Sequence, residues 1–246
     1  MSVSPFLADD EDLSDLALRD YRLIQRKNGF RFSMDAVLLA HFVRPQRKQK
    51  IIDLGCGSGV LPILLFADEP TRLITAVEIQ AVYADLARRN MALNQVPCQI
   101  YEADLRSLPA EWGSTFDAVV SNPPFFPKNC GKLNPNEEIN IARHEIYCTL
   151  EDLIQSSKRL LKPRGSLYLI YRAARTDELL SLCAKYSLKP KRLRFIHPFA
   201  DQAANLLLLE AVKGGRDTLE ILPPLFIYRS PHVYSNEIIQ IYGGII

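Results

Sequence analysis

The sequence lacks any apolar run long enough to span a membrane, and its acidic, polar N-terminus lacks the layout of a secretory signal. Its five cysteines are scattered, no two have the spacing of a zinc-binding knuckle, and their odd number argues against a disulfide framework. We therefore expect a cytoplasmic protein with reduced thiols and no bound metal. The 246 residues, 48% hydrophobic and 24% charged, suffice for one globular domain with short additions at each end.

Charge is nearly balanced over the whole chain, with a net charge of +2, but it is unevenly distributed. The first 20 residues hold six acids and one base, whereas the stretch Lys158–Arg216 holds thirteen bases and four acids. This basic stretch could attract a polyanion, or it could be an ordinary solvated surface. If it binds RNA, reversal of Lys189, Lys191 and Arg192 to Glu should weaken that binding.

Apolar runs of strand length alternate with helical patterns, which predicts an α/β fold with a parallel sheet and helices on both faces. The seven predicted strands are Lys50–Leu54, Leu73–Glu78, Gln99–Ala103, Phe116–Ser121, Ser166–Tyr171, Lys191–Ile196 and Asn205–Ala211. The predicted helices are Val60–Ala67, Val82–Leu93, Leu150–Leu161 and Arg175–Tyr186. The last strand is nearly all apolar, so we expect it inside the sheet.

Two segments outside these elements carry further expectations. The stretch Pro127–Glu145 is polar and long for a connection within a compact domain, so we interpret it as a lid over the substrate. The tail segment Leu222–Tyr228 contains two adjacent prolines, which would confine it to an edge of the sheet.

A glycine-rich turn, Asp53-Leu54-Gly55-Cys56-Gly57-Ser58-Gly59, follows the first predicted strand and opens a helix. Glycines allow a tight turn and a close approach of a ligand to the backbone. A dinucleotide-binding turn needs a glycine at its sixth position, which here is Val60 or Pro62, depending on the starting glycine. Instead, Asp53 precedes three alternating glycines. Its carboxylate suits a ligand with an ammonium group, such as S-adenosylmethionine, and would repel a pyrophosphate.

Two more acids stand at the ends of the next two predicted strands. Glu78 could accept hydrogen bonds from both ribose hydroxyls, and Asp104 could accept one from the adenine amino group. We include both acids, their neighbours Ile79 and Leu105, and Cys56 of the turn in the predicted cofactor site. Each acid alone could be an ordinary turn or cap residue. Three acids together with the glycine turn favour an S-adenosylmethionine site.

The motif Ser121-Asn122-Pro123-Pro124-Phe125-Phe126 closes the fourth predicted strand. An exocyclic amino nitrogen is a weak nucleophile, because its lone pair is delocalised into the π system. The side-chain oxygen of Asn122 and the carbonyl oxygen of Pro123 could accept the two amino hydrogens and turn the lone pair toward the methyl donor, which Asn122 also borders. The prolines stiffen the segment, and Phe125 or Phe126 can stack on a planar substrate. The motif therefore predicts an amino-directed methyltransferase that needs no metal.

Six short motifs also carry a resemblance to a known family: Asn28–Ala40, Ile52–Gly55, Ala76–Gln80, Ser121–Phe126, Ala142–Glu145 and Ile241–Gly243. They resemble the bacterial valine-tRNA adenine-37 N6-methyltransferases, and the resemblance extends from about Leu18 to the end of the chain. It implies a class I methyltransferase (Rossmann-like) fold, with a seven-stranded, mostly parallel sheet whose last strand is antiparallel. It also implies methyl transfer to an adenine N6 in tRNA.

The predicted elements divide the chain into an N-terminal extension and cofactor cover (residues 1–46), a methyltransferase core (residues 47–212) and a tail packing on that core (residues 213–246). The resemblance implies that the segment Phe30–Asp35 folds over the cofactor, where Phe32 would shield the sulfonium from water and Asp35 would contact the methionyl end. At the end of the predicted lid, Arg143 and His144 could cap the helix that starts near Thr149, but the resemblance favours contact with the substrate.

The cofactor and the amino target follow from the residues, but the tRNA substrate does not. Glutamine methyltransferases acting on release factors, guanine-N2 methyltransferases and DNA adenine methyltransferases use similar Asn-Pro-Pro motifs. The basic stretch favours a nucleic acid over a protein, and the small size of the chain disfavours sequence-specific DNA reading. An inactive cofactor-binding, RNA-associated protein is a further alternative, and the intact Asn122-Pro123-Pro124 argues against it. We expect tRNA adenine as the substrate.

Overall fold

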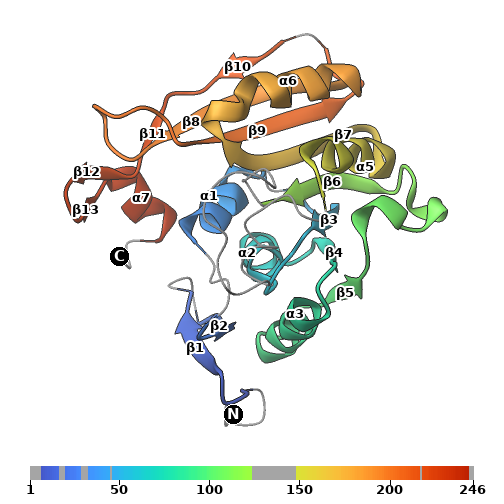
Figure 1. Cartoon of the computed structure of the whole chain (residues 1–246), viewed down its shortest axis with the longest axis vertical. Helices are drawn as coiled ribbons and strands as arrows, with labels where there is room; N and C mark the ends of the chain where they lie inside the picture. Colours follow the sequence, from blue (N-terminus) through green and yellow to red (C-terminus); the bar gives the residue numbers. More distant parts are fainter. Residues whose placement is uncertain are drawn as a thin grey trace.

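The computed structural model describes residues 7–16, 20–28, 33–44, 46–123, 148–216 and 218–243. Within these residues a nine-stranded sheet forms the centre of the molecule (Figure 1). Along one path its strands follow the order β10 (Glu220–Ile221), β8 (Leu188–His197), β9 (Leu206–Lys213), β7 (Leu161–Arg172), β6 (Phe116–Ser121), β3 (Lys50–Leu54), β4 (Leu73–Glu78) and β5 (Cys98–Glu102). A further short strand, β11 (Leu225–Phe226), also pairs with β8.

The last long strand, β9, lies between β7 and β8 and is antiparallel to both. The strands from β7 through β6, β3 and β4 to β5 run parallel to one another. The predicted position of the last strand inside the sheet is confirmed, and its physical cause is the run of buried leucines Leu206–Leu209. Instead of seven strands the sheet has nine, because β10 and β11 of the tail extend the sheet beyond β8.

Helices cover both faces of this sheet. On one face lie α1 (Met34–Phe42), α2 (Val60–Asp68) and α3 (Ala81–Leu93), and on the other lie α5 (Leu150–Leu160) and α6 (Thr176–Lys185). Neighbouring residues of β3 point to opposite faces, so that Ile51 joins the hydrophobic core on the side of α1 and α2, and Ile52 the core on the side of α5 and α6. α5 begins with a capping box between Thr149 and Asp152.

Two short units flank the sheet. An antiparallel hairpin of β1 (Glu11–Asp15) and β2 (Arg22–Arg26) packs against α3, at the lower left of Figure 1. At the other end of the chain, the hairpin of β12 (Tyr228–Ser230) and β13 (Val233–Tyr234) leads into α7 (Asn236–Ile241). None of the described helices combines the length and the apolar character needed to cross a membrane.

The carboxyl ends of β3, β4, β5 and β6 meet at one edge of the sheet. In an open α/β sheet, ligands bind outside the edge formed by the carboxyl ends of the strands, where neighbouring connections leave in opposite directions. Three short 3-10 helices also lie near strand ends: Leu105–Ser107, Ala110–Trp112 and Ala173–Arg175. The glycine turn, the acids and the Asn-Pro segment of the sequence therefore converge on the edge where a ligand is expected.

Candidate functional site

The glycine turn connects β3 to α2 and bends the chain sharply. Its three glycines all adopt positive φ angles: 79° at Gly55, 53° at Gly57 and 83° at Gly59. The backbone amides of Gly55 and Cys56 both donate to the carbonyl of Val77 in β4, at 2.9 and 3.0 Å. These bonds attach the turn to the neighbouring strand, so the N-terminus of α2 faces the carboxyl edge of the sheet.

Gly59 is required for a second reason, because α3 lies directly against it. A Cβ atom at this position would lie 2.9 Å from the terminal methyl of Met91 and 3.2 Å from the Cβ of Ala87. The residue also caps α2 in a left-handed conformation that side chains disfavour. The turn is therefore closely packed against α3 as well as bonded to β4.

Asp53, at the end of β3, is a buried carboxylate that lacks a partner among the described residues. Its side chain is 1% exposed, and neither carboxylate oxygen has a hydrogen bond there. Burial raises the pKa of Asp53 well above its usual value, and the nearby charge of Glu78 raises it further. Because an unpaired buried charge is costly, this position suits a cationic ligand group that would compensate it.

A small cavity opens beside Asp53, with a volume of about 50 Å³. Asn122, Ser33 and the glycine turn also line it. This volume is well below the several hundred Å³ of a whole-ligand pocket, so the cavity fits only a small part of a cofactor. Ser33 belongs to the segment Phe30–Asp35 that was predicted to fold over the cofactor, whereas the lining residues Ala36, Ser58, Val60 and Leu61 were not predicted as site residues.

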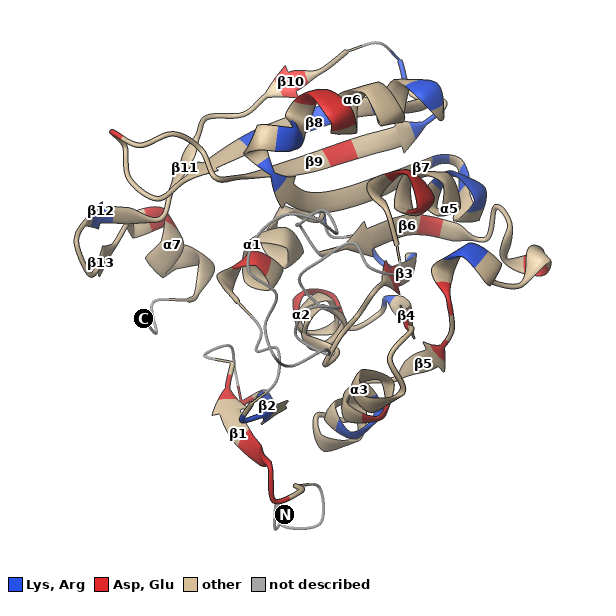
Figure 2. Cartoon of the chain, in the orientation of Figure 1, with Lys and Arg blue, Asp and Glu red and all other residues tan. Residues whose placement is uncertain are grey.

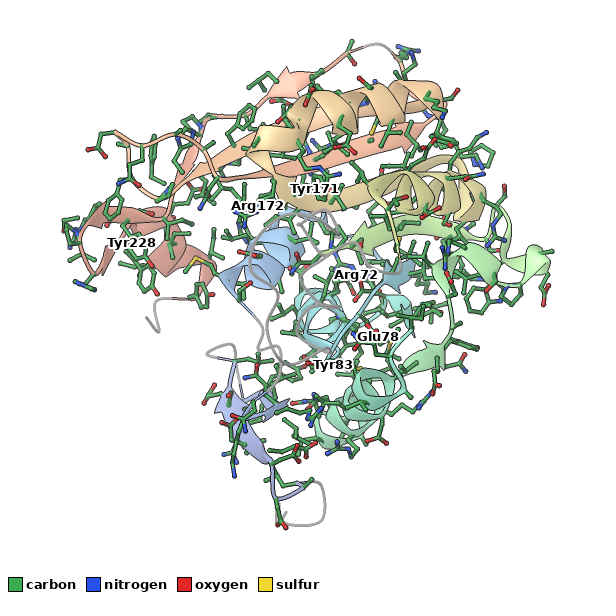
Figure 3. All side chains as sticks on the ribbon, in the orientation of Figure 1. Arg72, Glu78, Tyr83, Tyr171, Arg172 and Tyr228 are labelled. Atoms are coloured by element: carbon green, nitrogen blue, oxygen red, sulfur yellow. The ribbon has the colours of Figure 1, made fainter. Side chains whose placement is uncertain are left out.

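Glu78, labelled in Figure 3, lies at the end of β4 and holds the glycine turn by a hydrogen bond. One of its carboxylate oxygens accepts from the amide of Gly57 and the other from the amide of Gln80, both at 2.9 Å. The side chain is 6% exposed, and burial raises its pKa. Each oxygen keeps a second lone pair, so the carboxylate can still accept from ligand hydroxyls. The next residue, Ile79, is exposed.

Asp104 follows β5, and its carboxylate is hydrogen-bonded to Arg106, two residues further along the chain. Arg106 donates to it from the backbone amide and from the guanidinium group, and these hydrogen bonds hold the pKa of Asp104 below its usual value. The structure thus differs from the expectation of an acceptor open to an adenine amino group. The reason is local: the carboxylate caps the 3-10 helix that begins at Leu105, where Arg106 is two residues away.

The end of β6 is tied to the end of β3. The hydroxyl of Ser121, which is fully buried, donates to the carbonyl of Leu54 at 2.7 Å. The next residue, Asn122, lines the same cavity as Asp53, and Pro123 is half-buried beside it. Asn122 and the glycine turn therefore line one cavity, as the sequence predicted. Six predicted site residues lie outside the described part of the chain: Phe32, Pro124, Phe125, Phe126, Arg143 and His144.

Asp35, in the first turn of α1, does not line the cavity. Burial raises its pKa, while a hydrogen bond with Ser33 and the charge of Arg172 act in the opposite direction. Figure 3 shows Arg172, at the end of β7, next to α1. On this helix it is Ser33 and Ala36 that reach the cavity. Asp35 therefore lies outside the cavity lining, and its contact with the methionyl end stays a prediction.

Within the basic stretch, the side chain of Arg192 is not part of an exposed surface. This side chain is 12% exposed, pairs with Glu210, donates to the carbonyl of Phe42 at 2.8 Å and stacks over the Phe42 ring. Lys191 donates to the carbonyl of Arg216 and to Thr218. Reversal of Arg192 would also disturb the end of α1, so Lys189 and Lys191 are the better positions for testing the predicted effect of charge reversal on RNA binding.

Many of the remaining bases lie at the edge of the sheet away from Asn122. Lys162 lies at the start of β7, Lys189 at the start of β8, and Lys213 at the end of the antiparallel β9. Figure 2 shows basic segments at the right-hand ends of α5 and α6, on the side opposite α7. Within the described residues, no group of three or more His, Cys, Asp or Glu is placed to hold a metal ion.

Curated relatives match this chain over most of its length. A protein from Parabacteroides distasonis called tRNA1(Val) (adenine(37)-N6)-methyltransferase is 29% identical over 220 residues, which cover 86% of this chain and 88% of the relative. A relative of the same name from Aliivibrio salmonicida is 25% identical over 218 residues, covering 87% and 89%.

Solved structures share the fold. A protein from Agrobacterium tumefaciens described as a predicted O-methyltransferase has a TM-score of 0.70 and 24% identity, covering 86% of this chain and 97% of the other. TYW2 from P. horikoshii, solved with MeSAdo, has a TM-score of 0.59 and 13% identity, covering 85% and 73%. The expected class I methyltransferase fold is confirmed.

The family model called Methyltransferase small domain matches residues 33–182, which is more than half of the chain. This range begins at Ser33 beside the cavity and contains the glycine turn, Glu78, Asp104 and Asn122. The chain therefore belongs to the Methyltransferase small domain family and is a methyltransferase with a class I fold.

Proposed function

We propose that this protein transfers the methyl group of S-adenosylmethionine to the exocyclic N6 nitrogen of an adenine in tRNA. One observation carries the proposal: Asn122, an amide that can hold an amino group, shares a cavity with Asp53, a buried carboxylate suited to an ammonium group. Donor and acceptor would thus meet at one edge of the sheet. The reaction would take place in the cytoplasm, where tRNA is modified in a bacterium.

The cofactor roles follow from the chemistry of the turn. Asp53 would pair with the methionyl ammonium, and the backbone amides at the N-terminus of α2 would bind the methionyl carboxylate. Glu78 would accept hydrogen bonds from the ribose hydroxyls through its remaining lone pairs. Ile79 and Leu105 would flank the adenine ring. For Asp104 to accept from the adenine amino group, Arg106 would have to share or release its carboxylate.

When bound, S-adenosylmethionine would supply an electrophilic methyl group, and its sulfur would leave as the thioether of S-adenosylhomocysteine when the S–C bond breaks and the N–C bond forms. Asn122 Oδ1 and the carbonyl oxygen of Pro123 would accept the two amino hydrogens of the substrate, directing its lone pair at the methyl carbon. After transfer, the nitrogen would release one proton to water. The side chains of Phe125, Phe126, Arg143 and His144 are proposed to contact the substrate on the strength of the sequence alone.

The tRNA substrate is supported by the names of relatives that align with most of the chain. We further propose that residues 1–46 cover the cofactor and that residues 213–246 support the core from its far edge. The alternatives from other classes remain distinct outcomes of one experiment. A glutamine or guanine-N2 methyltransferase would give another methylated product, and an inactive RNA-associated protein would give none.

The test incubates the protein with S-adenosylmethionine carrying a labelled methyl group and tRNA prepared from cells that lack this enzyme. Nucleosides from the digested tRNA are then identified by mass spectrometry. We expect label in N6-methyladenosine alone. Label in methylguanosine, or label only in an added protein substrate, would contradict the choice of adenine, and the absence of any label would contradict the enzyme role on tRNA.

Replacement of Glu78 by alanine should weaken the binding of S-adenosylhomocysteine by about 10–100-fold, because two acceptors for ribose hydroxyls and two for backbone amides are lost together. Isothermal titration calorimetry gives the dissociation constant directly. Glu111, exposed in a 3-10 helix away from the turn, provides the control, and Glu111→Ala should bind like the unaltered protein. Unchanged affinity of Glu78→Ala would remove Glu78 from the cofactor site.

A further inference from the structure

One side chain of α3 connects the glycine turn to the N-terminal hairpin. Asn90 is fully buried, and its side-chain amide makes three hydrogen bonds. Its oxygen accepts from the amide of Ile24 at 2.7 Å, and its nitrogen donates to the carbonyl of Ile24 at 3.0 Å and to the carbonyl of Ser58 at 2.9 Å. Ser58 lies in the turn and lines the cavity. Both amide hydrogens of Asn90 are therefore in use.

Asn94, which directly follows α3, makes the same two bonds to β2. It accepts from the amide of Arg22 at 3.0 Å and donates to its carbonyl at 2.7 Å, and it also donates to the carbonyl of Asn90 at 2.8 Å. Four residues of a helix advance by about 6.0 Å and two residues of a strand by about 6.8 Å, so two asparagines at this spacing match alternate residues of β2. The two asparagines thus bond to the edge of β2 that lies away from β1, much as a neighbouring strand would. Of the two side chains, only that of Asn90 also bonds to the glycine turn.

The hairpin is attached to α3 by further contacts. Ile24 packs with Tyr83 and Leu86 of α3 in a small buried cluster, and Figure 3 shows Tyr83 on the stretch of the helix near Glu78. Glu11 of β1, itself 7% exposed, forms a two-point ion pair with Arg89 at 2.6 and 2.7 Å. The hairpin therefore binds to α3 as a unit, and Asn90 is placed at the centre of the contact.

On the other side, Asn90 completes the support of the turn. Gly55 and Cys56 are bonded to β4, Gly57 is bonded to Glu78, and the carbonyl of Ser58 is bonded to Asn90. Loss of the Asn90 amide would leave the Ser58 carbonyl without this partner. Among the described residues, the peptide between Ser58 and Gly59 would then be held only through the Gly59 amide, which donates to the carbonyl of Cys56 at 2.9 Å. That peptide directly precedes α2, whose first residues line the cavity.

The geometry points to Asn90 as a positioning residue that sets the cofactor turn and couples it to the N-terminal hairpin. This inference rests on the proposed binding of S-adenosylmethionine and extends it to the hairpin of β1 and β2, which precedes the turn in sequence. Because coupling between two sites is reciprocal, a ligand that orders the turn also strengthens the docking of the hairpin. Asn90 does not reach the ligand; it acts through the backbone of Ser58.

The experiment compares Asn90→Ala with Asn94→Ala, since both variants lose two hydrogen bonds to β2 and only the first loses the bond to the turn. We expect Asn90→Ala to raise the dissociation constant of S-adenosylhomocysteine at least tenfold, or about 1.4 kcal/mol, and Asn94→Ala to change it less than twofold. In turnover assays, the KM for S-adenosylmethionine should rise for Asn90→Ala while kcat at saturating cofactor stays within about threefold.

A third variant separates positioning from a general loss of stability. Ser157 is fully buried in α5 on the opposite face of the sheet and donates to the carbonyl of Leu153. Ser157→Ala should lower the melting temperature without changing cofactor affinity. Equal affinities of Asn90→Ala and Asn94→Ala would overturn the inference, as would an effect of Ser157→Ala as large as that of Asn90→Ala.

Hydrogen exchange on the unaltered protein tests the same coupling even if Asn90→Ala fails to fold. Saturating S-adenosylhomocysteine should slow exchange of the Ile24 amide, which donates to Asn90, at least tenfold, and should leave the amides of the β12–β13 hairpin unchanged. An unchanged rate at Ile24 in a protein that binds the ligand would overturn the coupling alone. A protein that does not bind S-adenosylhomocysteine would overturn both this inference and the proposed function.

Discussion

Replacement of Asn122 by alanine should abolish methyl transfer and leave the affinity for S-adenosylhomocysteine within tenfold, or about 1.4 kcal/mol. The side-chain oxygen of Asn122 is proposed to act on the substrate amino group, whereas the turn and the acids bind the cofactor. A contact that matters only as the amino group attacks the methyl lowers kcat without loosening the ground-state complex. We expect kcat to fall by at least about 100–1,000-fold, the loss that follows removal of one preorganised catalytic contact.

Single-turnover transfer of labelled methyl to tRNA gives the rate, and calorimetry gives the affinity. Asn236, exposed at the start of α7, serves as a matched substitution, and Asn236→Ala should retain full activity. If Asn122→Ala loses cofactor affinity in proportion to rate, Asn122 is a cofactor ligand and not part of the amino clamp. If the variant keeps its activity, the mechanism proposed here is wrong.

Asp53→Asn should have two opposite effects, a loss of cofactor affinity and a gain in stability of the ligand-free protein. The amide cannot pair with the methionyl ammonium, and loss of one partner of a buried charge pair costs about 2–5 kcal/mol, or roughly 30-fold to several thousand-fold in affinity. Without ligand, neither oxygen of this buried carboxyl group has a hydrogen bond in the described structure, so its ionisation in the folded protein is costly. Replacement by a group that cannot ionise should therefore raise the melting temperature of the ligand-free protein at neutral pH.

The gain in stability should depend on pH in a defined direction. Burial raises the folded-state pKa of Asp53 above its unfolded value of 3.8, so the folded protein holds a proton that the unfolded chain releases. The contribution of Asp53 to stability is therefore lost as the pH rises from about 3.8 through the raised folded pKa. Melting curves of Asp53→Asn and the unaltered protein should nearly coincide near pH 4, diverge as the pH increases, and keep a constant separation above the folded pKa.

Asp117 supplies a control with the opposite sign. Burial acts to raise its pKa, but the hydrogen bond from Lys162 at 2.6 Å and the neighbouring charges outweigh burial, and the pKa is lowered. Asp117→Asn should therefore lose stability at neutral pH, and this loss should disappear as the pH falls through the lowered folded pKa. A loss of stability in Asp53→Asn at pH 7 would show that the carboxylate has a stabilising partner without ligand.

The parallel core of the fold could be predicted because its signals are local. The strands β3, β4 and β6 begin and end at the predicted residues, since each is a short apolar run ended by a turn or a polar residue. The hairpin β1–β2 and the helix α1 were not predicted as elements. β1 reads EDLSD, an acidic segment whose strand conformation depends on pairing with β2 and on the ion pair between Glu11 and Arg89.

The candidate site could be predicted where a motif carries its own chemistry. Asp53, the glycine turn and Asn122 meet in the structure because parallel strands place their carboxyl ends together. Asn90 could not have been found in this way, since its role depends on contacts with residues 66 and 32 positions away. Asp104 lies near the end of its strand, as expected. The order of the strands could not reveal that Arg106, two residues later, would bind its carboxylate.

The two ends of α1 are held differently, and this affects the size of the cavity. Arg192 fixes the C-terminal end through the carbonyl of Phe42, while Ser33 and Ala36 at the other end form part of the cavity wall. A nine-residue helix is about 13.5 Å long, so a rotation of roughly 5° about the fixed end displaces its first residue by about 1 Å. Misplacement on that scale can change a reaction rate by about 100-fold. Residues that contact α1 far from the reacting atoms can thus adjust the distance between methyl donor and acceptor.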